Sequence, residues 1–138
     1  MIRRDVALAP SGGIVLIEGR VCELSLTGLA PCVVLTELAL LDQALVDELS
    51  FRDERNGFRL IFAKGVGITF PRVVVRERQI RMDVPETMLK YLMIFFLRYY
   101  QAGFPEVDHL DFEAGFNQES GGVFDLLVTV SPAPPTPS

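Results

Sequence analysis

The stretch "DVPETMLKYLMIFFLRYYQ", residues 83–101, predicts the helix at the centre of the expected core. Asp83 is a good helix N-cap, and Pro85 suits a first helical turn. Gly103 and Pro105 predict where the helix stops. Apolar side chains surround most of its circumference, so we expect this helix to lie deep in the protein, packed against a sheet.

A second helix is predicted over residues 31–50, "PCVVLTELALLDQALVDELS". Its apolar side chains recur at spacings of three and four, which is typical of one buried helical stripe; they are Val34, Leu38, Leu41, Leu45 and Leu49.

The remaining apolar segments predict strands, because they are rich in β-branched and aromatic residues and are bounded by turn residues. They cover residues 5–9, 13–26, 58–63, 67–75, 79–84, 107–116 and 123–130. Residues 10–13 predict a turn that pairs the first two as a hairpin. We therefore expect an α+β domain, a twisted antiparallel sheet of about six strands with two helices, in the order ββα-ββα-ββ.

Length and composition favour one compact domain. The 138 residues are 49% hydrophobic and 22% charged, which suits a single buried core. We expect this domain to span residues 1–130. The segment "SPAPPTPS", residues 131–138, is uncharged and rich in proline, and is predicted to be disordered.

Charge and cysteine content narrow the classes of partner and compartment. The net charge of -5 argues against nucleic acid, whose phosphates need clustered Lys and Arg, and favours a basic protein partner. Cys22 and Cys32 lack the spacing of a zinc or redox site, so we expect no metal, no cofactor and a reducing, cytoplasmic location. The apolar run at Tyr91–Leu97 is far shorter than the roughly 20 residues of a membrane span, and we expect no membrane partner.

The stretch "VDHLDFEAGF", residues 107–116, contains the one histidine of the chain. If this stretch is a strand, its period of two places His109, Asp111 and Glu113 on one face. Neighbours two residues apart lie about 6 to 7 Å from each other, too far for one to orient another directly as a catalytic pair. A solvent-facing acidic surface is therefore favoured over a catalytic or metal site. Asp125 on the next strand extends the same face.

The second predicted helix carries Glu37, Asp42 and Asp47 and no basic residue. These acids form a second candidate surface for a basic partner. The alternative is that they serve solubility alone.

Four arginines, Arg72, Arg76, Arg78 and Arg81, form the one basic cluster. Arg72, Arg76 and Arg78 are the candidates for an alternative function, in which arginines hold phosphate or carboxylate groups. Ion pairs with nearby acids are favoured over this role, because Glu77 and Asp83 lie among the arginines.

The stretch "GRVCELSLTGL", residues 19–29, resembles the second signature of PilZ domains. The matching positions are Glu23, Ser25 and Gly28. The resemblance implies binding of cyclic di-GMP, together with an upstream Arg-x-x-x-Arg. Glu23 stands where that family has Asp or Asn, and Arg3 and Arg4 are followed by Ala7 and Leu8 where the second arginine belongs.

These patterns favour a non-catalytic, cytoplasmic binding protein over an enzyme. Its size, its acidity and the missing catalytic motifs resemble those of bacterial toxin-neutralising immunity proteins, an analogy of general properties. Three alternatives stay open: a PilZ-like cyclic di-GMP sensor, an acidic secretion chaperone, which would form a homodimer, and a small enzyme that uses His109.

Overall fold

The computed structural model describes residues 1–28, 30–101, 108–117 and 122–131, with the backbone alone for residues 108, 109 and 113–117. They form one α+β domain with two helices and nine strands. The elements are β1 (Arg3–Ala7), β2 (Gly12–Ile17), β3 (Val21–Thr27), α1 (Ala30–Asp42), β4 (Glu48–Asp53), β5 (Phe58–Gly65), β6 (Arg72–Arg76), β7 (Gln79–Pro85), α2 (Glu86–Gln101), β8 (Asp108–Asn117) and β9 (Val123–Ser131). The proline-rich tail lies outside the described residues from position 132 onward.

The strands follow the order β1-β4-β5-β7-β6-β8-β9-β3-β2. Four neighbouring pairs are antiparallel hairpins: β2–β3, β4–β5, β6–β7 and β8–β9. The other four pairs, β1–β4, β5–β7, β6–β8 and β3–β9, are parallel. The expectation of an antiparallel sheet of about six strands is therefore wrong. Hairpin pairing is set by local turns, whereas the parallel pairs join distant segments and leave no local signal.

The N-terminal hairpin is also placed differently from the expectation. Residues 13–26, predicted as one strand, form β2 and β3, which turn back at Glu18 and Gly19. Both turn residues have positive φ, 52° and 69°, and such a pair is typical of a two-residue hairpin turn. β1 pairs instead with β4, and directly after β1 the amide of Leu8 donates a hydrogen bond to the carbonyl of Arg52 at 2.9 Å.

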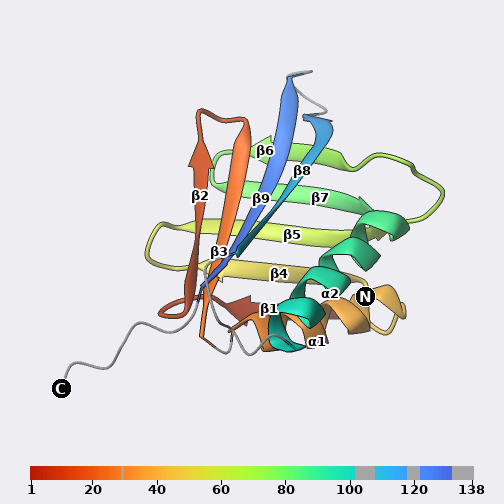
Figure 1. Ribbon diagram of the computed structural model, residues 1–138. Helices are drawn as coiled ribbons and strands as arrows, with labels where there is room; N and C mark the ends of the chain where they lie inside the picture. The colour runs from red at the N-terminus through yellow and green to blue at the C-terminus, as the bar shows by residue number, and fades with distance from the viewer. Residues whose placement is uncertain (29, 102–107, 118–121, 132–138) are drawn as a thin grey trace.

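The nine strands divide into two parts that cross in space (Figure 1). The five-strand part contains β1, β4, β5, β7 and β6, and the four-strand part contains β8, β9, β3 and β2. Among the described residues two pairs join them along the order, Arg72 with Phe116 and Val73 with Asn117. The four-strand part and the two helices lie on the same side of the five-strand part, and the core fills the space between these layers.

The core is built from the inner faces of the strands and one stripe of each helix. Its largest buried side chains include Phe51, Phe62, Phe96 and Phe124, and the rings of Phe51 and Phe62 meet edge to face at 5.4 Å. Burial of this apolar surface is the main source of stability.

Helix α2 confirms the predicted element but not its start or its depth. Asp83 and Pro85, predicted as its N-cap and first turn, belong to β7, and the helix begins at Glu86. Its buried residues lie on one stripe: Met88, Leu89, Leu92, Phe96 and Tyr99. On the opposite side Ile94 and Leu97 are each 45% exposed, and on the two flanks Tyr91 is 63% exposed and Tyr100 is 56% exposed. The expectation of a helix buried on most sides is therefore wrong; α2 lies at the edge of the core.

Helix α1 ends at Asp42, eight residues before the predicted end at Ser50. Ala44 has a φ of 57°, which stops the helix, and the chain then enters β4. Val34, Leu38 and Leu41 form the buried stripe as predicted, but Leu45 is 61% exposed and Leu49 is buried in β4. β4 is buried on both faces, so its sequence does not alternate between polar and apolar residues. Leu49 of this strand happens to continue the helical spacing of α1, which made the predicted helix too long.

Candidate partner-binding face

The hairpin β8–β9 has the two faces that the sequence predicts, wherever its side chains are described. Phe124, Leu126, Val128 and Val130 of β9 are buried, and the residues between them are half-buried on the opposite face. On β8, Leu110 and Phe112 pack against the core while Asp111 between them is exposed. Asp111 and Asp125 therefore lie on the outer face of the four-strand part.

The strand register continues this outer face across β3 and β2. Asp111 pairs with Leu127, which pairs with Glu23, which pairs with Val15. The next row contains Glu113, Asp125, Val21 and Ile17, and a third contains His109, Thr129, Ser25 and Gly13. The positions of His109 and Glu113 follow from the backbone pairing; their side chains lie outside the described ones.

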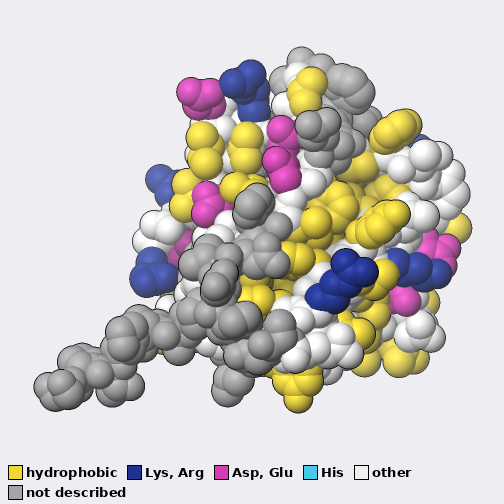
Figure 2. Space-filling model, viewed as in Figure 1, with side chains coloured by type: hydrophobic (Ala, Val, Ile, Leu, Met, Phe, Trp, Pro, Cys, Tyr) yellow, Lys and Arg dark blue, Asp and Glu magenta, His cyan; other side chains and the backbone are white. Residues whose placement is uncertain are grey.

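We name this surface the acidic–apolar face; its described side chains are Asp111, Asp125, Glu23, Val15, Ile17, Val21 and Leu127. None of the strands β2, β3, β8 and β9 contains Lys or Arg. Val15 is 47% exposed and Ile17 is 40% exposed. Figure 2 shows acidic and apolar side chains interleaved on this part of the surface. Exposed apolar groups beside charges of one sign are typical of protein interaction surfaces.

The carboxylates of this face differ in their hydrogen bonding. Glu23 accepts a hydrogen bond from the hydroxyl of Ser25 at 3.2 Å. Oδ1 of Asp125 is buried and has no hydrogen-bond partner among the described residues. A buried carboxylate oxygen without a hydrogen bond costs stability.

Sequence reasoning predicted that Asp111, Glu113, Asp125 and His109 share one face but did not include Glu23, Val15 and Ile17. The sequence partly indicates the position of Glu23, because the alternation along residues 21–27 places it on the opposite face from the buried Cys22 and Leu24. The parallel pairing of β3 with β9, which brings the two groups together, could not be predicted from local patterns.

The second predicted surface, formed by Glu37, Asp42 and Asp47, does not exist as one acidic helix face. Glu37 is buried and accepts two hydrogen bonds from Arg4, at 2.8 and 3.0 Å. This hydrogen bonding and the charge of Glu37 raise the pKa of Arg4.

The other two acids of that group also contact their own chain. Asp47 lies beyond the end of α1 and accepts a hydrogen bond from the amide of Ile2 at 2.8 Å. The Lys64 ammonium donates to the carbonyl of Asp42 at 2.7 Å and lies 4.0 Å from its Oδ1. The helix itself has no basic residue, and basic partners come from β1 and β5.

The arginine cluster is divided among structural contacts. Arg81 donates to Glu48 at 2.8 Å, which agrees with the expectation of ion pairs. Arg78 lies 5.4 Å from the centre of the Phe58 ring and donates to the carbonyl of Asn56. Arg72 and Arg76 lie on β6, and a hollow of about 230 Å³ beside them is lined by Val74, Arg76, Gln79 and Arg81.

The PilZ-like positions and the upstream arginines lie on strands that are not neighbours. Glu23 and Ser25 belong to β3, and Gly28 follows it with a φ of 61°. Arg3 and Arg4 belong to β1, where they pair with Glu48 and Glu37.

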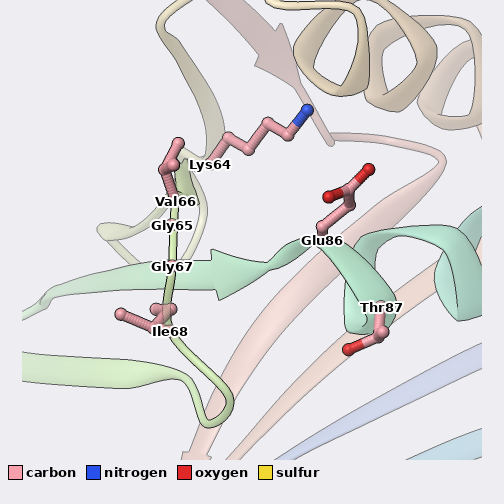
Figure 3. Close-up of a pocket in the computed structure, with 7 residues that line it drawn as sticks. All are labelled: Lys64, Gly65, Val66, Gly67, Ile68, Glu86 and Thr87. Carbon is pink, nitrogen blue, oxygen red and sulfur yellow. The ribbon is translucent and has the colours of Figure 1, made fainter.

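A second hollow, of about 330 Å³, lies where the loop after β5 meets the start of α2. It is lined by Lys64, Gly65, Val66, Gly67, Ile68, Glu86 and Thr87 (Figure 3). Hydrogen bonding to Lys90, with the charges of Lys90 and Lys64, lowers the pKa of Glu86. The hollow thus contains one cation and one anion, and sequence reasoning did not find it.

Comparison with known proteins adds little to this geometry. No family model matches the chain, and no curated protein matches it. Among solved structures the chain is similar to Drosophila Suppressor of Fused, with 15% sequence identity and a TM-score of 0.41. The similarity covers 91% of this chain and 29% of that chain, so the chain spans less than a third of the other protein. Within the described residues no helix is long and apolar enough to cross a membrane.

Proposed function

We propose that this protein binds a basic partner protein through the acidic–apolar face and thereby masks it. The observation that supports the proposal is the register that aligns Asp111, Asp125 and Glu23 with Val15 and Ile17 on strands without a basic residue. Carboxylates attract and orient a cationic surface, and the apolar groups provide area for burial.

A bacterial immunity protein that neutralises a toxin is the form of this function that we propose. Such a protein needs a complementary surface and no catalytic group of its own. Both cysteines are free thiols, which supports a place in the cytoplasm, where thiols stay reduced.

The first step of the test identifies the partner. The protein is purified with whatever it binds from its native cells, and the partner is identified by mass. We expect a protein with a basic surface, and an acidic partner would contradict the proposal. Binding of the purified partner is then measured by calorimetry.

Two double variants with equal changes in net charge test the face itself. Glu23→Lys with Asp111→Lys reverses two charges of the acidic–apolar face. Glu54→Lys with Glu77→Lys reverses two exposed charges in turns of the five-strand part and is the matched control. We expect the first variant to lose affinity at least about a hundredfold and the control to change it less than about threefold. Equal affinities for the two variants would overturn the proposal.

The neutralising role has a separate readout. Cells that produce the identified partner should be inhibited, and co-production of the wild-type protein should restore their growth. The variant of the acidic–apolar face should not restore it. A partner that leaves growth unaffected would contradict the toxin-neutralising role while leaving the binding face intact.

A further inference from the structure

Strand β1 ends the sheet, and within the described residues it pairs with β4 alone. The amide of Glu48 donates to the carbonyl of Ile2, and the amide of Leu8 donates to the carbonyl of Arg52. These contacts fix the phase of the strand: the backbone groups of even-numbered residues face β4. Arg3, Asp5 and Ala7 therefore direct their amides and carbonyls toward the open edge.

We propose that this edge pairs with the same edge of a second copy of the chain, antiparallel and about a twofold axis. Only odd-numbered residues direct their amides and carbonyls toward the open edge. Each of them must therefore lie opposite an odd-numbered residue of the second copy. Two central registers satisfy this condition. One places Arg3 opposite Asp5 of the second copy, and the other places Asp5 opposite itself.

Charge selects the first register, because opposite charges across a strand pair attract and like charges repel. Arg3 lies 3.3 Å from Glu48 and Asp5 lies 3.2 Å from Arg52 of their own chain, but their side chains are 70% and 48% exposed, so each can also meet the other across the edge. By the twofold symmetry it forms the Arg3–Asp5 contact twice. Charged residues on an edge strand usually keep edges apart. Here the order Arg-x-Asp is complementary to itself when a second copy runs in the opposite direction.

Apolar side chains fit the same register. Ile2, which is 59% exposed, falls opposite Val6 of the second copy. Val6 lines a hollow of about 210 Å³ beside the edge, whose wall also contains Leu8 and the 50% exposed Val33. The exposed Ile2 of each copy thus meets apolar surface of the other.

Arg4 falls opposite Arg4 of the second copy on the axis. Each Arg4 already donates two hydrogen bonds to Glu37 of its own chain, so its charge is largely compensated. The dimer uses none of the acidic–apolar face and is independent of the proposed function. The two ends of the strand order, β1 and β2, would then serve different contacts.

Sedimentation velocity at protein concentrations up to about 1 mM tests the dimer, because an interface this small is weak. We expect the wild type to dimerise as concentration rises. Arg3→Asp and Asp5→Arg, each alone, should weaken dimerisation at least about tenfold by placing like charges opposite each other. An equimolar mixture of these two variants should form a heterodimer, because each then faces the opposite charge.

A backbone variant tests the pairing without a change of charge. Ala7→Pro removes an amide that faces the open edge and no bond to β4, so dimerisation should be lost while the melting temperature stays close to that of the wild type. Val6→Pro removes an amide that faces β4 and should unfold the protein. A wild type that stays monomeric throughout, or a dimer that survives both Arg3→Asp and Ala7→Pro, would overturn the proposal.

Discussion

The carboxylate of Asp53, at the end of β4, accepts a hydrogen bond from the backbone amide of Ile14, on strand β2, at 2.9 Å. This contact ties the five-strand part to the free edge of the four-strand part. Asp53 is 1% exposed and also accepts hydrogen bonds from the amides of Arg55 and Asn56 and from the side chain of Asn56. The Arg55 guanidinium adds a second tie, to the carbonyl of Gly12 at 2.8 Å.

Replacing Asp53 should destabilise the fold. Asp53→Ala leaves the buried amide of Ile14 without an acceptor, and we expect a loss of about 1–3 kcal/mol in the free energy of unfolding. Urea denaturation followed by circular dichroism measures this loss. Glu54→Gln removes an exposed carboxylate next to it and is the control, with an expected change below about 1 kcal/mol. Equal stabilities of the Asp53→Ala and Glu54→Gln variants would refute the tie between the two parts.

Stability should also depend on pH through the same carboxylate. Burial, the largest influence on Asp53, acts to raise its pKa, but the hydrogen bonds together outweigh it and lower the pKa below its ordinary value of 3.8. A lowered pKa in the folded state means that the stabilisation is fully present above the unfolded pKa and is lost as pH falls through the folded pKa. The stability difference between the wild type and Asp53→Asn should therefore shrink below about pH 4. A difference that stays constant down to about pH 2 would contradict this assignment.

The two cysteines should differ in reactivity. Burial, with a smaller contribution from the charge of Glu23, raises the pKa of Cys22 to about 12, whereas Cys32 is half-buried on α1. Because the thiolate is the reactive form, a disulfide reagent at pH 8 should modify Cys32 in the folded protein and both thiols in urea. Cys32→Ser should then show no rapid reaction in the folded state, and rapid labelling of this variant would show that Cys22 is accessible.

Binding of the basic partner should weaken with salt. The four strands of the acidic–apolar face contain no basic residue, so their carboxylates add to a field of one sign. We expect the association rate to fall at least about tenfold between 0.05 and 0.5 M salt, with a smaller change in the dissociation rate. Surface plasmon resonance measures both rates. An association rate that does not respond to salt would mean that the carboxylates do not guide the encounter.

Cyclic di-GMP should not bind. Arg3 and Arg4 pair with Glu48 and Glu37, and Glu23 accepts a hydrogen bond from Ser25, so neither arginine is paired with a PilZ-like position. Calorimetric titration at high micromolar ligand should give no heat beyond dilution. Heat that disappears in Arg72→Ala or Arg76→Ala would instead support the arginine-based alternative.

Local patterns in the sequence predicted the features that depend on interactions between residues close together in the chain. The presence of α2, the buried stripe of α1 and the two faces of β9 all follow from side-chain periodicity and turn residues. The outward position of Asp111 and Asp125 follows from the same period of two. These features need no knowledge of which strands are neighbours.

Which segments meet depends on packing in three dimensions. The tertiary structure paired β3 with β9 and so joined Glu23 to Asp125 on one face, and it brought Arg4 to Glu37 and removed that acid from the surface. It also separated the charges, with arginines on the strands of the five-strand part and none on those of the other. Parallel pairing depends on contacts between residues that are far apart in the chain. The energies of these contacts are set by burial in three dimensions, so local sequence patterns do not predict them.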